Sequence, residues 1–132
     1  MHIIASILVG LVALEHLWFL VLEMFLYQTP TGLETFQITQ QAADTCAVLA
    51  KNQGLYNGFL SAGLITAIAT RSMALRRFNL VCVIIAGIYG TMSLGSTKII
   101  LLQSVPALLA LIVTELMGRR SFAGQAGSSE GR

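Results

Sequence analysis

The chain has 132 residues, of which 55% are hydrophobic and only 11% are charged, and its formal net charge is +2. Soluble domains carry roughly 25% charged residues, so this composition excludes an ordinary soluble globular protein and favours an integral membrane protein. The small net charge provides no basic surface for a nucleic acid, and the sequence contains neither a phosphate-binding glycine loop nor a Cys-x-x-Cys pair.

Four stretches of the chain are long and apolar enough to cross a bilayer, which takes about 20 mainly apolar residues in a helix. They cover most of the sequence: about 3–27, 53–70, 78–97 and 99–118. We therefore predict an all-α fold, an integral membrane four-helix bundle that forms one domain over residues 1–118. The first stretch lacks a basic leader and a convincing cleavage site, so we interpret it as a retained helix.

The first stretch carries three ionisable residues. Glu15 and His16 fall near its middle, and Glu23 lies about one turn from its outer end. An ionisable residue at the centre of a membrane helix costs about 2.5–3.5 kcal/mol on insertion scales, so such residues usually face the bundle interior. His16 and Glu23 lie almost in line on one helix face, and Glu15 lies about 80° from Glu23. We predict that all three address one interior sector, as ligand-binding or proton-relay residues.

The segment 28–52 joins the first two stretches on the outer side. It opens with the helix-breaking run QTPTG at 28–32. Thr31 and Glu34 have the spacing of a capping box, which predicts a helix that starts near Gly32. Its apolar residues form a loose stripe. The pattern fits a short amphipathic helix on the membrane surface or an extension of the second membrane helix, and the sequence does not distinguish the two.

The second stretch has small residues at four-residue intervals: Gly54, Gly58 and Ala62. Such a ridge lets two helix backbones approach closely. We expect it to serve helix packing, either inside the chain or between copies of the chain in a homo-oligomer.

The third and fourth stretches are joined by a short turn, SLGSTK at 93–98. Pro106 in the fourth stretch is tolerable because neighbouring helices can satisfy the freed carbonyl. Residues 119–132 are rich in Gly and Ser, which predicts a disordered cytoplasmic tail.

The arginines predict the orientation in the membrane. They cluster in the expected loop at 71–77 and directly after the fourth stretch: Arg71, Arg76, Arg77, Arg119 and Arg120. The opposite side has only Lys51 and Lys98. By the positive-inside rule, we expect both termini to be cytoplasmic.

Polar side chains from all four stretches are expected in one layer beneath the outer surface. At about 1.5 Å per residue, Glu23 and Asn57 lie at similar depths, roughly 6 Å below the ends of their helices. The other candidates at or just above this depth are Asn52, Gln53, Tyr56 and Gln103, with Thr91, Ser93 and Lys98 nearby. Interhelical hydrogen bonds of about 0.6 kcal/mol each would also account for such a layer without any ligand.

The runs EHLWFLVLEMFL at 15–26, TPTG at 29–32 and NQGLYNGFLSAGL at 52–64 resemble a bacterial family filed as "domain of unknown function 1304". The resemblance extends over essentially the whole chain to about residue 118. It implies a small four-helix inner-membrane protein and assigns no biochemical activity.

These observations support three classes of function. A polar pocket open to the outer side would bind or move a small molecule, ion or proton, with Glu15 and His16 as a deeper proton relay. The alternatives are an intramembrane enzyme that acts on a lipid or quinone by acid–base chemistry and a structural or accessory subunit. The sequence identifies no cofactor. A metal held by Glu15, His16 and Glu23 is the weaker option, since the Glu-x-x-His pairs of di-metal bundles are absent.

Overall fold

A computed structural model describes the backbone of residues 2–129 and the side chains of residues 3–118. Every regular element in this part of the chain is helical, as predicted, and two short segments are π-helical (η1 and η2). In chain order the elements are α1 (His2–Val21), η1 (Leu22–Leu26), α2 (Pro30–Phe36), α3 (Gln40–Ala69), α4 (Met73–Leu94), α5 (Thr97–Ile99), η2 (Ile100–Ser104) and α6 (Val105–Ser129).

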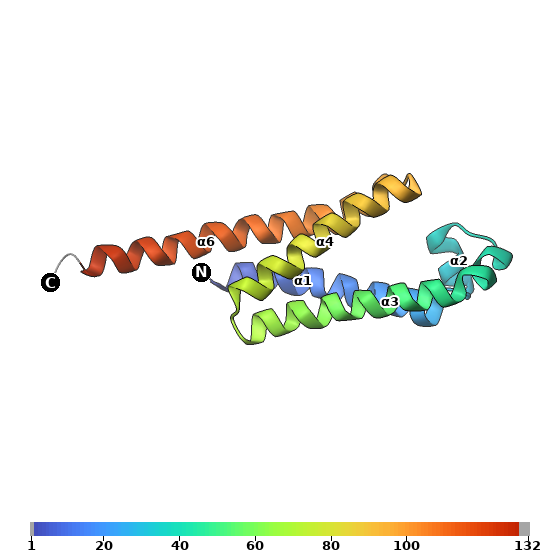
Figure 1. Cartoon of the computed structure of the whole chain (residues 1–132), viewed down its shortest axis with the longest axis horizontal. Coiled ribbons are helices and arrows are strands. Elements are labelled where there is room, and N and C mark those ends of the chain that lie inside the picture. Colours follow the sequence, from blue (N-terminus) through green and yellow to red (C-terminus); the bar gives the residue numbers. More distant parts are fainter. Residues whose placement is uncertain (1, 130–132) are drawn as a thin grey trace.

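The long helices α1, α3, α4 and α6 pack side by side in a ring (Figure 1). Helix α1 contacts α3 and α6, and α4 contacts the same two helices. At the N-terminal end of the molecule, α1 begins and a tight turn joins α3 to α4 (Figure 1). At the opposite end, which we call the α2 end, α2 covers η1 and another turn leads from α4 into α5.

Among the residues that the structure describes, three helical segments are long and apolar enough to cross a membrane: Ile3–Leu26, Met73–Leu94 and Thr97–Gly118. Helix α3 is also long enough, but Gln53, Asn57 and Ser61 lower the mean hydropathy of its C-terminal half. The first, third and fourth predicted stretches thus correspond to apolar helices. A fourth crossing by α3 stays a prediction.

The connection between the first two predicted stretches contains two helices. Residues from Gln40 onward extend the second stretch as α3, and α2 is a separate short helix. The predicted capping box of Thr31 and Glu34 is wrong. Thr29 is the N-cap, and its hydroxyl accepts from the Gly32 backbone N–H at 3.5 Å. Pro30 explains the difference, because its fixed φ and missing N–H suit the first helical position, directly after the cap.

The expected basic loop at 71–77 is shorter than predicted. Ser72 caps α4 by accepting from the Leu75 backbone N–H at 3.3 Å, so Arg76 and Arg77 belong to the first turns of that helix. Only Arg71 stays in the turn, with φ of 54°. A serine at the N-cap satisfies a backbone N–H of the first turn that would otherwise lack a partner. The helix therefore begins earlier than predicted and includes Arg76 and Arg77.

The end of the chain also differs from the prediction. The backbone of α6 is helical as far as Ser129, whereas a disordered tail is expected over 119–132; residues 130–132 lie outside the described part. No proline follows Pro106 in the sequence, so every later residue can supply its helical N–H, and the helix continues through Gly118.

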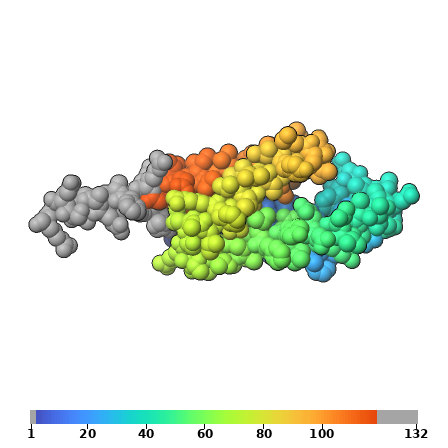
Figure 2. Space-filling view, in the orientation of Figure 1, coloured from blue at the N-terminus to red at the C-terminus, as the bar shows by residue number. Residues whose placement is uncertain are grey.

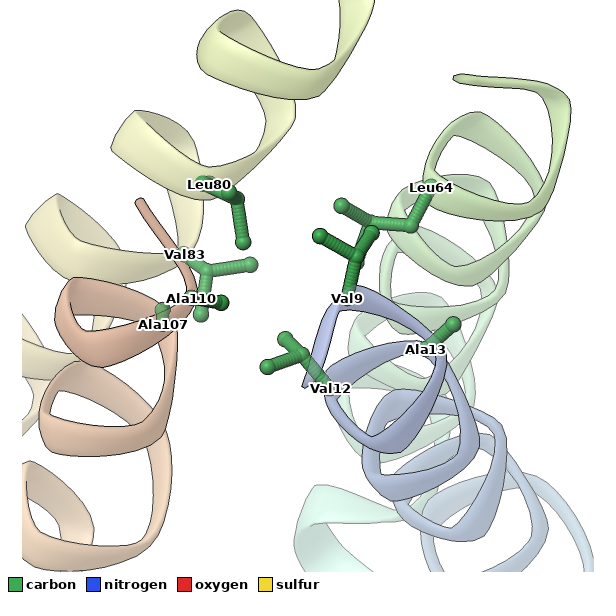
Figure 3. Packing of buried hydrophobic residues seen from close by; sticks show 8 residues of the cluster. All are labelled: Val9, Val12, Ala13, Leu64, Leu80, Val83, Ala107 and Ala110. Carbon is green, nitrogen blue, oxygen red and sulfur yellow. The ribbon is translucent and has the colours of Figure 1, made fainter. Parts of the chain in front are cut away.

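Small apolar side chains form the core between the four long helices. Figure 3 shows them facing one another across the interior: Val9, Val12, Ala13, Leu64, Leu80, Val83, Ala107 and Ala110. Many large apolar side chains point outward instead, and Ile3, Phe25 and Met92 are each at least 67% exposed. A soluble protein rarely presents so much apolar surface, so this distribution fits a protein surrounded by lipid.

Candidate functional site

A carboxylate and an amide meet between the first and third helices of the chain. Asn57 of α3 is buried, and its Nδ2 donates to Oε2 of Glu23 in η1 at 2.7 Å. The two residues are 34 positions apart in sequence. The expectation that they lie at similar depth therefore corresponds to a direct contact in the structure.

Gly54 allows this contact. A Cβ atom at Gly54 would lie 2.6 Å from Cγ of Met24 and 3.1 Å from Cβ of Glu23, so α3 touches the backbone region of η1 at this point. Residues three apart on a helix share a face, and Asn57 is therefore brought to the same neighbour. Without a side chain at position 54, the two helices come close enough for the Asn57–Glu23 hydrogen bond.

The other two residues of the small-residue ridge, Gly58 and Ala62, differ in their contacts. A Cβ atom at Gly58 would lie 2.5 Å from Cδ1 of Leu20, so Gly58 also packs against α1. Ala62 is exposed. Because α1 and η1 pack against Gly54 and Gly58, these glycines serve helix packing within the chain, and a homo-oligomer through the ridge stays a prediction.

The π-helical turns were not predicted from the sequence. Glu23 lies in η1, and Gln103 lies in η2, where the Val105 backbone N–H donates to Ile100 O. Single π turns inside α-helices occur frequently at functional sites. The nearby Pro106 is a signal for η2, since proline cannot supply the next helical N–H. We find no corresponding signal in the sequence around η1.

Gln103 is placed by contacts between α4 and η2. Next to it, the Ser104 hydroxyl donates to Ile84 O at 3.0 Å and lies against Gly87. A Cβ atom at Gly87 would come within 3.1 Å of Cβ of Gln103, so this glycine lets η2 approach α4. The α4–η2 pair thus repeats the glycine-mediated contact seen between α3 and η1.

His16 and Glu15 occupy different surroundings. His16 is only 1% exposed, its Nδ1 donates to Val12 O at 2.9 Å, and its ring meets the Phe19 ring edge-on at 5.6 Å. Glu15 is half-buried. Residues 3–118 contain no group of three His, Cys, Asp or Glu side chains that could hold a metal ion. The metal option with Glu15, His16 and Glu23 stays a prediction, and the hydrogen bond of His16 Nδ1 to Val12 O would leave only Nε2 of that ring as a possible ligand atom.

Among the described residues, no contact joins the other residues of the predicted polar layer to Glu23. Asn52, Gln53 and Tyr56 are exposed, and the Tyr56 ring packs on the Phe59 ring at 6.1 Å. Thr91 and Ser93 donate to carbonyls of their own helix, at Gly87 and Tyr89. Lys98 is exposed. Short hydroxyl side chains readily bond to the carbonyl one turn back in their own helix. A similar depth in the membrane therefore does not by itself bring Thr91 and Ser93 into contact with Glu23.

Helix α2 covers the end of η1 close to Glu23. Gly32 of α2 lies against the backbone carbonyls of Leu26 and Tyr27, and the Tyr27 and Phe36 rings pack at 5.2 Å. Figure 2 shows a hollow between the end of α4 and the α2 end of α3.

Comparisons with known proteins place the chain in a family. Residues 10–114 match the family described as "Protein of unknown function (DUF1304)". An uncharacterized protein, YpaA, of Lactococcus lactis subsp. lactis (strain IL1403) is 39% identical over 116 residues, which are 85% of this chain and 97% of that protein. No solved structure matches the chain.

Proposed function

The chain belongs to this DUF1304 family of unknown function, and we propose that it is a multi-pass membrane protein that binds a small cationic or hydrogen-bond-donating molecule at Glu23 and Asn57. In this proposal α3 is the fourth membrane crossing, through its residues 53–70. Both termini then face the cytoplasm of a bacterial inner membrane, and the ligand enters from the outer side. The packing of α3 against both α1 and α4 supports the fourth crossing, because a helix between two spans shares their environment.

The hydrogen bond between Asn57 and Glu23 is the observation that carries the proposal. Asn57 uses one of its two amide N–H groups in this bond, so its second N–H and its Oδ1 are left. Ionised Glu23 has two oxygens with about four lone-pair sites, and Asn57 occupies one of them. Apart from the second N–H of Asn57, the pair offers acceptors to a third group, which favours a cation or a donor of hydrogen bonds.

The test compares Glu23→Gln with the wild type in detergent. Thermal unfolding is measured in chlorides of sodium, potassium, ammonium and methylammonium at one ionic strength, and native mass spectrometry reports any co-purified ligand. At 100-fold excess over Kd, a ligand stabilises the folded protein by about 2.7 kcal/mol. We expect one of these cations to raise Tm for the wild type and not for Glu23→Gln.

The matched control is Glu34→Gln, which removes the same charge from an exposed position on α2. It should respond to the cations as the wild type does. A wild-type protein that gains no stability from any of the four cations and carries no extra mass would contradict the proposal. Because glutamine at position 23 can still accept from Asn57, unchanged stability without added cation separates the binding role from a purely structural one.

His16 favours a proton-relay role as a second candidate. Its Nδ1 must carry a hydrogen to donate to Val12 O, so in the neutral ring Nε2 is the nitrogen that accepts a proton. Proton flux into liposomes that contain the protein should then fall in His16→Gln. The same residue would provide acid–base chemistry in the alternative of an intramembrane enzyme acting on a lipid or quinone.

A further inference from the structure

A buried arginine lies at the N-terminal end of the molecule, opposite to the α2 end. Arg76 in the first turns of α4 is only 5% exposed. Its Nη2 donates to the Ser6 hydroxyl of α1 at 3.3 Å, and its Nε is buried without a hydrogen-bond partner among the described residues. A guanidinium group has five N–H donors and is always charged. A buried charge of this kind requires a counter-charge.

No carboxylate whose side chain the structure describes supplies that counter-charge. Arg77, the next residue, forms a bidentate ion pair with Glu115 of α6, in which Nη2 and Oε2 are 2.9 Å apart. Among residues 3–118 this is the one ion pair that the structure contains. Arg77 is thus compensated, whereas no carboxylate among residues 3–118 forms an ion pair with the buried Arg76.

Arg76 lines a pocket of about 810 Å³ at this end of the molecule. Arg71 and Ser6 accompany it on the polar side, and Ile3, Ile7 and Ile68 form an apolar wall. Arg71 is held at the edge by the turn between α3 and α4, where its backbone N–H donates to Ile68 O at 3.2 Å. The pocket therefore combines two guanidinium groups with branched apolar side chains.

This combination fits an amphiphile with an anionic head. Guanidinium groups bind phosphate oxygens by paired, charge-assisted hydrogen bonds. Basic pockets between membrane helices on the cytoplasmic side are suited to anionic lipid head groups. In the proposed orientation the N-terminal end faces the cytoplasmic leaflet. The arginines of the pocket then face the head group of a lipid, and the isoleucines face its acyl chains.

We propose that this pocket binds the phosphate of an anionic phospholipid. Arg76 and Arg71 contact the phosphate, Ser6 keeps the Arg76 side chain in place, and an acyl chain lies against Ile3, Ile7 and Ile68. The bound lipid supplies the missing counter-charge of Arg76. This site is separate from Glu23 and Asn57, so it stands or falls independently of the function proposed for them.

Native mass spectrometry of the full chain in detergent tests the proposal. The probes are phosphatidylglycerol and phosphatidylcholine with identical acyl chains, and inorganic phosphate. Phosphatidylglycerol should bind at least tenfold more tightly than phosphatidylcholine. Arg76→Met, which replaces the buried charge by an apolar side chain of similar length, should lose this preference, whereas Arg77→Met should keep it.

Arg71→Met provides a second variant if Arg76→Met does not fold, because Arg71 is exposed in a turn. It should weaken phosphatidylglycerol binding severalfold and leave the folded protein intact. Equal binding of the two lipids by the wild type, or an unchanged preference in both the Arg76→Met and Arg71→Met variants, would overturn the proposal. Displacement of phosphatidylglycerol by millimolar inorganic phosphate would also overturn it, since the site would then select a free anion.

Discussion

Replacing Gly54 by alanine should separate α3 from η1 at the candidate site. The added Cβ would lie 2.6 Å from Cγ of Met24 and 3.1 Å from the Met24 backbone nitrogen. The Met24 side chain can rotate away, but the backbone nitrogen belongs to a packed helix and moves only if η1 moves. We therefore expect the helices to part by a few tenths of an ångström and the Asn57–Glu23 hydrogen bond of 2.7 Å to lengthen.

The expected change in the free energy of unfolding has two destabilising contributions and one stabilising contribution. Overpacking in a close-packed interior costs roughly 1–3 kcal/mol, and a weakened interhelical hydrogen bond costs about 0.6 kcal/mol more. Alanine has a higher helix propensity than glycine, which returns about 1 kcal/mol. The net destabilisation of Gly54→Ala should therefore be about 0.6–2.6 kcal/mol.

Equilibrium unfolding in mixed micelles measures this difference. Gly10→Ala in α1 is the matched control, because its Cβ would lie 3.9 Å from Cδ1 of Ile68, an ordinary van der Waals contact. Gly10→Ala should be neutral or stabilising by up to about 1 kcal/mol. If Gly54→Ala proves as stable as Gly10→Ala, the close approach at Gly54 does not hold the two helices in register and the reasoning is wrong.

Three other outcomes are expected. Hydrogen bonds from Gln28 and a second glutamine amide lower the pKa of Asp44 below 3.8, so its carboxylate stabilises the connection into α3 above that pH and loses this effect as pH falls through the lowered pKa. Hydrogen exchange around Gln28, corrected for intrinsic rates, should therefore rise at low pH in the wild type and show no such pH dependence in Asp44→Asn. Ser61→Ala removes a 2.8 Å bond to a carbonyl of α1 and should lower the free energy of unfolding by about 0.6–1 kcal/mol, as unfolding titrations can show. In spheroplasts of a cysteine-free background, an impermeant maleimide should label Glu34→Cys and not Arg71→Cys, and labelling of both would refute an odd number of crossings between them.

The sequence was sufficient for the class of fold and for part of the site. Apolar stretches of membrane length predict helices, because lipid leaves no other way to satisfy backbone polar groups than helices or closed barrels. The constant rise of a helix places Glu23 and Asn57 at similar depth, and the structure joins them by a hydrogen bond. The same count places Thr91 and Ser93 in the layer, but their hydroxyls bond to their own helix.

Local sequence determined which residues form helices in this protein and where ionisable groups fall along them, since hydrophobicity and helix rise act within each segment. Tertiary packing alone decided what those groups meet. Gly54 brings α3 onto η1 and so pairs Asn57 with Glu23. Glu115 pairs with Arg77, and no carboxylate among residues 3–118 forms an ion pair with the buried Arg76. In the sequence alone, the positive charge of Arg76 indicated only the orientation of the protein in the membrane. Its burial depends on which helix lies beside it, and no single segment carries that information.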